Sequence, residues 1–261
     1  MLPRPRTTVF ARMLRAAWLV GTLLVSSSAL FAEPAQTRIV CRGNIHLAQR
    51  EDLTKKLKRI TGWSDLRFDR DGMLRLGTKE PVGGSPTARA LLEQSAFGSN
   101  FIVLEDASKR SEVVFSRVIA GKWKYESSNS PSAFVVQIDF ADFAHVMGDE
   151  RAREAFDAGW GLLHELDHIV NESLDATSLG EAGECEDHIN QMRRECNLPE
   201  RASYFFTLLP LTSDPVFMTR LVRLAFEQEQ TTPNKKKRYW LVWDANLVGG
   251  LDEQKQIASL R

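Results

Sequence analysis

The chain has 261 residues, with 34 Lys and Arg against 34 Asp and Glu. Four of the arginines lie in residues 1–32, so the rest of the chain carries 30 basic against 34 acidic residues, a net charge of −4. This balance gives no electrostatic basis for binding nucleic acid, which we do not expect as a partner. The 229 residues after position 32 are enough for one domain with a hydrophobic core.

Residues 1–32 have the pattern of a secretory signal peptide. Their arginines come first and no acidic residue occurs among them, and an apolar run then extends from Ala16 to Phe31. The run is shorter than the roughly 20 residues that span a bilayer. We therefore expect export to a periplasm or to the medium, with membrane association only if the leader stays uncleaved.

Residues 33–261 are expected to form a single α+β domain in which residues 83–227 make the catalytic core. The elements predicted in its first half alternate between the two types. They are a helix over Glu51–Ile60, a β-hairpin over Leu66–Leu76, a helix from Pro86 to about Ala96, and strands over Phe101–Glu105, Val113–Ile119 and Ala133–Phe140. Short links between these strands favour a small, mostly antiparallel sheet. The last strand is a candidate edge for pairing with an extended peptide.

A long helix is predicted next, from an N-cap at Asp149 to about Val170, because the segment contains no proline and becomes apolar around most of its girth. A second helix should run from Glu181 or Glu184 to Cys196. Residues 203–209 and 215–227 resemble further helical segments. A strand over Tyr239–Trp243 belongs to a C-terminal appendage of residues 235–261.

The long helix contains the most informative motif of the chain, His164-Glu165-Leu166-Asp167-His168. Residues four apart share one helix face, so the imidazoles of His164 and His168 are candidate ligands for one zinc ion. Zinc acidifies a bound water molecule, and Glu165 beside it is the candidate general base and then acid. The alternative interpretation is a pair of ordinary hydrogen-bonded core histidines.

A catalytic zinc usually has three protein ligands, and several residues are candidates for the third. A metzincin extension would need Gly at 171 and His at 174, where this chain has Asn171 and Leu174. Asp175 would require a tight reversal of the chain after the helix. The remaining candidates lie at the start of the second helix: Glu181, Glu184, Glu186, Asp187 and His188.

The motif followed by Gly183-Glu184-Cys185-Glu186-Asp187-His188 resembles a gluzincin-type zincin, whose third ligand is a Glu on the following helix. Residues 190–193 and 198–201 are also similar to segments of compact bacterial zincins, and the resemblance covers about residues 155–205. It implies a zincin-like fold and Glu186 as the third ligand, with Glu184 as the alternative. Tyr204, Arg201 and Arg193 are candidate oxyanion donors.

These observations together predict an exported zinc-dependent metallopeptidase that acts on a peptide or protein, with His164, His168 and Glu186 holding Zn²⁺ and Glu165 as the catalytic residue. The alternative is a non-catalytic exported binding domain on an inactive zincin scaffold, with a structural zinc. His188 together with a nearby Glu would close the coordination in that case.

The three cysteines, Cys41, Cys185 and Cys196, are odd in number and include no CxxC pair, so they do not form a disulfide framework. Cys185 and Cys196 lie about 16 Å apart along one predicted helix, so buried thiols are expected. A bridge between them becomes feasible only if that helix breaks.

Overall fold

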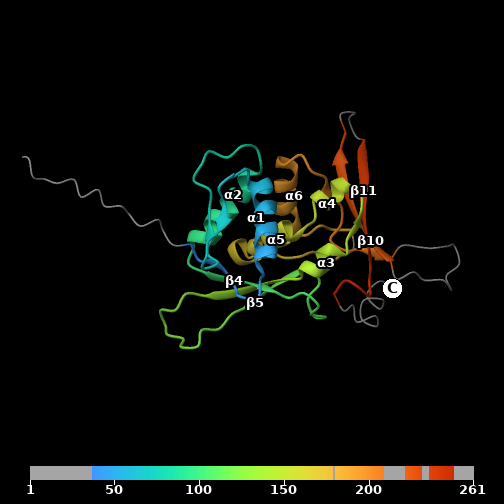
Figure 1. Ribbon diagram of the computed structural model, residues 1–261. Helices are drawn as coiled ribbons and strands as arrows, with labels where there is room; N and C mark the ends of the chain where they lie inside the picture. Colours follow the sequence, from blue (N-terminus) through green and yellow to red (C-terminus); the bar gives the residue numbers. More distant parts are fainter. Residues whose placement is uncertain (1–36, 179, 209–220, 231–234, 250–261) are drawn as a thin grey trace, which may run out of the picture. The chain divides into compact units, whose positions relative to one another are not determined.

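The computed structural model describes residues 37–178, 180–208, 221–230 and 235–249, which have the mixed α+β composition predicted from the sequence (Figure 1). The helices are α1 (Leu47–Thr61), α2 (Pro86–Phe97), α3 (Phe140–Ala144), α4 (Glu150–Glu154), α5 (Ala158–Asn171) and α6 (Glu184–Glu195). The strands are β1 (Ile39–Cys41), β2 (Arg67–Phe68), β3 (Leu74–Arg75), β4 (Phe101–Asp106), β5 (Ser116–Ala120), β6 (Ala133–Ile138), β7 (Met147–Gly148), β8 (Glu200–Arg201), β9 (Thr207–Leu208), β10 (Leu221–Glu229) and β11 (Lys236–Asp244).

The first sheet has the strand order β1-β4-β6-β5, and only β5 runs antiparallel to its neighbour. The prediction that β4 and β5 are antiparallel neighbours is wrong. The link between them crosses the end of β6, where Ala107 N donates to Ile138 O and Asp139 N donates to Phe115 O, both at 2.8 Å. As a result β6 is interior and β5 is the edge strand, so the expected edge at residues 133–140 is also wrong.

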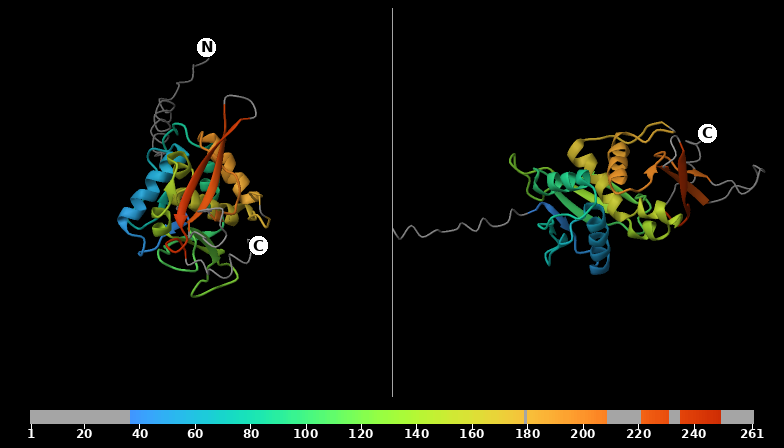
Figure 2. Two further views of the ribbon diagram at one scale, coloured as in Figure 1. Left: turned by 90° about the vertical axis from the view of Figure 1, so that its right-hand side faces the viewer. Right: turned by 90° about the horizontal axis from the view of Figure 1, so that it is seen from above.

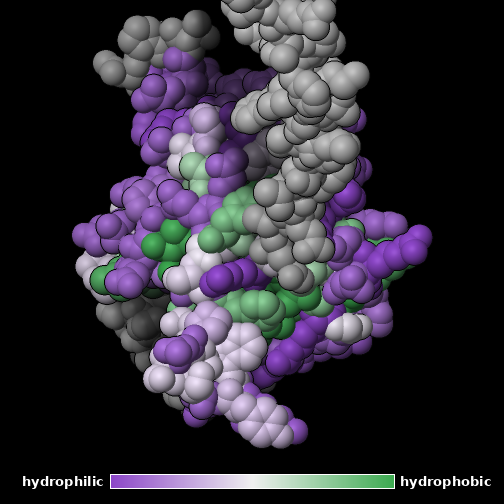
Figure 3. Space-filling model, turned by 90° about the vertical axis from the view of Figure 1, so that its left-hand side faces the viewer, coloured by the Kyte–Doolittle hydropathy of each residue, from purple (hydrophilic) through white to green (hydrophobic). Residues whose placement is uncertain are grey.

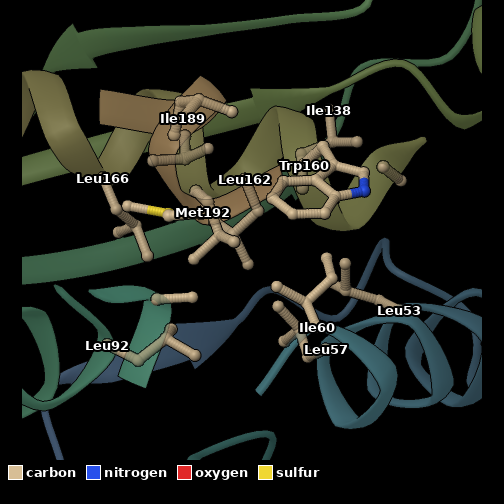
Figure 4. Packing of buried hydrophobic residues seen from close by; sticks show 14 of the residues in the cluster. Leu53, Leu57, Ile60, Leu92, Ile138, Trp160, Leu162, Leu166, Ile189 and Met192 are labelled. Atoms are coloured by element: carbon tan, nitrogen blue, oxygen red, sulfur yellow. The ribbon is translucent and has the colours of Figure 1, made fainter. Parts of the chain in front are cut away.

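The helix layer covers one face of this sheet (Figure 1). Helix α5 packs against β5 and β6 and is flanked by α1, α2 and α6. Figure 4 shows the resulting core, in which Trp160, Leu162 and Leu166 of α5 meet Leu57 of α1 and Met192 of α6. These five side chains are at most 1% exposed. Because α5 carries apolar side chains on most of its sides, it is the central helix of the domain.

The predicted helix over 149–170 is two helices. Helix α4 ends at Glu154, and α5 begins after Asp157, whose carboxylate accepts hydrogen bonds from Gly159 N and Trp160 N. This capping aspartate also pairs with Arg59 of α1 at 2.6 Å. Asp157 thus starts a new helix within the apolar pattern, because its carboxylate binds backbone N–H groups of the first turn of α5 that have no partner within the helix.

A second sheet, with the order β7-β11-β10-β8 and β9 beside β10, stands next to the helices (Figure 2). The helices predicted over 203–209 and 215–227 are therefore wrong in the parts that the structure describes: residues 203–206 are irregular, 207–208 form β9 and 221–227 belong to β10. Val222, Leu224 and Phe226 are buried at every second position and face the core, a period of two that belongs to a strand. The predicted strand over Tyr239–Trp243 is confirmed as part of β11.

Several local predictions from the first half of the chain are confirmed. Ser85 caps α2 by accepting from Ala88 N, with Pro86 as the first helical residue. Arg67 and Phe68 pair with residues 74–75 across the predicted hairpin. All three cysteines are free, and α6 continues unbroken from Glu184 to Glu195.

The predicted leader, residues 1–32, and much of the predicted appendage, residues 250–261, lie outside the described residues. Among the residues that are described, no helix has the length and apolar character needed to cross a bilayer. Figure 3 shows one face of the molecule, where hydrophilic residues predominate and hydrophobic ones form a small central area.

Candidate metal centre

Helix α5 brings the two histidines of the motif together as predicted. His164 Nε2 and His168 Nε2 lie 3.2 Å apart, and the two rings are nearly perpendicular, at 88°. A third ligand-type atom completes the group: Asp175 Oδ1 lies 3.1 Å from His164 Nε2 and 3.5 Å from His168 Nε2. These three atoms converge on one point from a single helix and the loop that follows it.

The spacing of the three atoms matches the coordination of zinc. Zn–N and Zn–O bonds of about 2.0–2.1 Å in a tetrahedral site place neighbouring ligand atoms about 3.3 Å apart. The three observed distances, 3.1, 3.2 and 3.5 Å, lie on both sides of that value.

A hydrogen bond at Nδ1 of His168 leaves the lone pair of Nε2 directed toward His164 and Asp175. The Nδ1 atom of His168 lies 2.8 Å from the carbonyl oxygen of Ser173, and a carbonyl can only accept, so Nδ1 carries the proton. Nε2 of the neutral ring then presents its lone pair to His164 and Asp175. A backbone carbonyl on the second nitrogen is a common arrangement for a metal-binding histidine.

One oxygen of Asp175 faces only the two imidazoles among the described residues. Its Oδ2 atom accepts a hydrogen bond from the Tyr204 hydroxyl at 2.8 Å, whereas Oδ1 is shielded from solvent and accepts no well-aligned hydrogen bond from any described residue. A buried, unsatisfied carboxylate oxygen is unfavourable unless a cation lies beside it. The residues present therefore fit a bound cation.

The reversal that brings Asp175 back to the histidines depends on two backbone features. Glu172 ends α5 in the left-handed conformation, at φ 54° and ψ 25°. Asp175 then forms an antiparallel bridge with Gly183, which has φ +85°, and a Cβ at that glycine would lie 2.3 Å from Ala176 N. Gly183, between Ala182 and Glu184, was the available signal in the sequence for this close approach.

The structure places Glu186, the third ligand chosen from the sequence, on the other side of the His164 ring. Its Oε2 lies 3.6 Å from His164 Nδ1, not among the three converging atoms. Both Glu186 oxygens are engaged by arginines, Oε1 by Arg193 and Oε2 by Arg201 at 3.0 Å. Burial alone would raise the pKa of Glu186, but the two guanidinium groups outweigh it and lower the pKa to about 2. Asp175, and not Glu186, supplies the third of the three converging atoms.

The other candidates lie farther from the group. Glu181 and Glu184 are exposed, and His188 Nδ1 is bound to Asp167 Oδ2 at 2.9 Å. Asp167 is fully buried and also accepts hydrogen bonds from Asn171 Nδ2 and Ser173 Oγ. It therefore holds the segment whose carbonyl binds His168. Of the candidate oxyanion donors, Arg193 and Arg201 are engaged by Glu186, and the Tyr204 hydroxyl donates to Asp175.

Cys185 is a residue of the site that the sequence analysis treated only as a buried thiol. Its sulfur lies 3.3 Å from His164 Nδ1 and 3.4 Å from the His164 carbonyl oxygen. One ligand atom each from His164, His168, Asp175 and Cys185 can be chosen so that all four lie within 4.8 Å of one another. The thiol is fully buried, which raises its pKa.

Glu165 is oriented by the edge strand of the first sheet. Ser116 Oγ, at the start of β5, donates to Glu165 Oε1 at 2.8 Å. Burial raises the pKa of Glu165, and it outweighs the opposing effects of His164 and of the Ser116 hydrogen bond. A raised carboxylate pKa favours proton transfer near neutral pH.

The electrostatic surroundings of His164 are acidic. Burial lowers the pKa of its imidazole, but Asp175, Glu186 and Glu165 together outweigh burial and raise it. The same surroundings favour any cation at this place. Comparisons with protein-family models, curated proteins and solved structures find no match to the chain, so the site is described by its own geometry alone.

Proposed function

We propose that this protein is an exported, zincin-like metallohydrolase that cleaves peptide bonds, with His164, His168 and Asp175 as the protein ligands of one zinc ion. The convergence of two imidazole nitrogens and the solvent-shielded Asp175 Oδ1 within 3.1–3.5 Å of one another is the observation that carries the proposal. Three ligands leave a coordination position open, as in catalytic zinc sites.

A bound zinc would acidify a water molecule and polarise a substrate carbonyl. Glu165 then takes the proton of the attacking water and returns it to the leaving amine. The Ser116 hydroxyl holds one oxygen of this carboxylate, Oε1, so that Oε2 is the oxygen proposed to receive the proton. The edge of β5 lies beside α5 and offers backbone groups to which an extended peptide can add as a strand.

The test combines metal analysis with the Glu165→Gln variant, which keeps the size of the side chain and removes its basicity. We expect about one zinc per chain in both proteins and a loss of peptide hydrolysis of about 10²–10⁴-fold in the variant. Glu150→Gln, at an exposed position of α4, is the matched control and should retain full activity. Undiminished turnover by Glu165→Gln would refute the assignment.

A second candidate function is a binding domain with a structural zinc, and the position of Cys185 favours it. If the thiolate becomes the fourth ligand, no position remains for water. Replacing zinc with cobalt(II) separates the two cases, because a thiolate ligand adds a sulfur-to-cobalt charge-transfer band in the near ultraviolet. A band that is present in the parent protein and lost in Cys185→Ser, together with absent hydrolysis, would support the structural zinc.

Export is proposed from residues 1–32 alone. Sequencing the N-terminus of the mature protein tests it: a start near residue 33 supports cleavage, and an intact Met1 would indicate an uncleaved leader.

A further inference from the structure

A cavity of about 270 Å³ opens beside Glu165 and His164. It lies between the first turns of α5, the segment that leads into β5, and the β10–β11 hairpin, elements that are seen together in Figure 2. Eight aromatic residues line it together with charged ones that include Glu165, Glu186, Arg193 and Arg201. Six of the aromatic residues make up what we call the aromatic wall: Phe115, Phe143, Phe156, Trp160, Phe206 and Trp243. Its volume is below the range of about 300–1,000 Å³ for sites that enclose a drug-sized ligand, so it suits a single side chain.

The aromatic wall is a connected cluster centred on Phe115. The ring of Phe115 lies 5.1 Å from Phe143, 4.9 Å from Phe156 and 5.3 Å from Trp243, measured between ring centroids. The latter two contacts are edge-on, at 85° and 89°. Such a cluster offers both ring faces and ring edges to a further aromatic group.

Phe115 has an unusual backbone conformation that fixes its place in the wall. Its φ is +63°, which is rare for a bulky residue without a glycine's freedom. The next residue, Ser116, holds Glu165. Phe115 of the aromatic wall is thus the neighbour in sequence of the residue that binds the proposed general base. Backbone strain of the kind seen at Phe115 concentrates at functional sites.

Gly161 keeps the cavity open on the side of α5. A Cβ at this position would lie 2.9 Å from Phe143 Cζ and 3.1 Å from Ser116 Oγ. Glycine is otherwise unfavourable inside a helix, by about 1 kcal/mol relative to alanine. A residue of any larger size would narrow the space between α5, Phe143 and the start of β5.

Most charged groups at the cavity are paired within the protein. Glu186 is bound by Arg193 and Arg201, whereas Glu165 is held only by the neutral Ser116 hydroxyl. A charged substrate group entering here would lose its hydration, and the one counter-charge open to it, Glu165, is needed as the base in the proposed function. The cavity therefore favours an uncharged occupant.

On the basis of the proposed function, we infer that this cavity, defined by the six aromatic residues and Gly161, binds a large apolar side chain, preferentially aromatic, of the substrate residue next to the scissile bond. The preferred substrates are thus peptides with Phe or a similar residue at that position. Small and charged residues there are discriminated against.

The first test measures binding without turnover, using N-acetyl-phenylalaninamide, N-acetyl-alaninamide and N-acetyl-lysinamide as probes. Binding to the zinc-loaded protein is followed by the fluorescence of its tryptophans, two of which line the cavity. We expect the phenylalanine amide to bind at least about tenfold more tightly than the other two, in line with the burial of one large apolar side chain. Equal binding of the phenylalanine and alanine amides would overturn the inference.

Two glycine-to-alanine variants in α5 test whether the phenylalanine amide binds in this cavity. In Gly161→Ala the added Cβ enters the cavity wall, whereas in Gly159→Ala it meets Lys56 Cβ at 2.9 Å and Ile60 Cδ1 at 3.1 Å, away from the cavity. We expect a loss of about tenfold or more for the phenylalanine amide in the first variant and an unchanged preference in the second. Equal effects of the two variants would contradict the location. If Gly161→Ala fails to fold by circular dichroism, Phe206→Leu takes its place with the same expected loss of preference.

The final test uses peptides that differ only in the residues flanking the scissile bond. We expect kcat/KM to rise about 10–100-fold from Ala to Phe. If hydrolysis occurs without this preference, the cavity inference fails and the hydrolase proposal stands. If no peptide is cleaved but the amide preference and its sensitivity to Gly161→Ala are found, the hydrolase proposal fails and the binding site stands.

Discussion

Replacing Asp175 with Asn should remove most of the zinc-dependent stabilisation of the fold. Asn retains a side chain of nearly the same size and can still bond to the Tyr204 hydroxyl, which lies 2.8 Å from Asp175 Oδ2. It loses the negative charge at Oδ1, the atom that lies 3.1 Å from His164 Nε2 without a well-aligned hydrogen bond from the described part of the chain.

The expected magnitude follows from ligand linkage. Loss of an outer-shell partner weakens metal binding about 10–100-fold, so loss of a ligand should exceed about 100-fold. At zinc concentrations above both dissociation constants, a 100-fold weaker affinity removes about 2.7 kcal/mol of stabilisation. For a domain of this size, that corresponds to a loss of about 5–11 °C in the Tm increase that zinc produces.

The assay is thermal unfolding followed by circular dichroism, with zinc and with excess chelator, supported by a competition titration of zinc affinity. Glu186→Gln is the informative comparison. It should lower the Tm of the zinc-loaded and metal-free forms by similar amounts, because it disrupts the buried pairs with Arg193 and Arg201. A zinc-induced Tm increase that survives Asp175→Asn and disappears in Glu186→Gln would refute the proposed ligand set of His164, His168 and Asp175.

Three further outcomes are expected. Arg193→Met should destabilise the fold by about 3–5 kcal/mol in a urea titration, because it leaves Glu186 buried with one of its two guanidinium partners, and a change below 1 kcal/mol would contradict this. Asp167→Asn should weaken zinc binding about 10–100-fold in a competition titration without changing the stoichiometry, since it loosens the Ser173 segment that orients His168. Burial raises the pKa of Glu195, but the hydrogen bonds from Ser85 and Thr87 outweigh burial and lower it, so the ionised carboxylate stabilises the fold fully above its unfolded-state pKa and loses this effect as the pH falls through its lowered folded-state pKa. Glu195→Gln should therefore reduce the loss of stability at acidic pH in urea titrations, and an unchanged acid dependence would contradict this.

Elements with strong local signals could be predicted from the sequence. Ser85 and Pro86 mark the start of α2, and Gly62 ends α1 in the left-handed conformation. The motif spacing placed His164 and His168 on one face of a helix, because that arrangement depends on helix geometry alone.

Features that depend on the path of the chain between elements could not be predicted in the same way. The interior position of β6 results from a link that crosses its end, which no periodicity encodes. Residues 221–229 had apolar spacing compatible with a helix, and pairing with β11 along their whole length made them a strand. Asp175 was set aside because a reversal was required, and Glu172 in the left-handed conformation provides that reversal.

The proposed metal ligands and the cavity wall come from very different lengths of chain. His164, His168 and Asp175 belong to one short stretch around the end of α5, whereas the cavity lining extends from Val114 to Trp243. Aromatic wall residues outside that stretch can therefore change during evolution while the three proposed ligands are retained. Under the proposed function, the preference for a substrate and the capacity for chemistry would then be separable heritable properties of this fold.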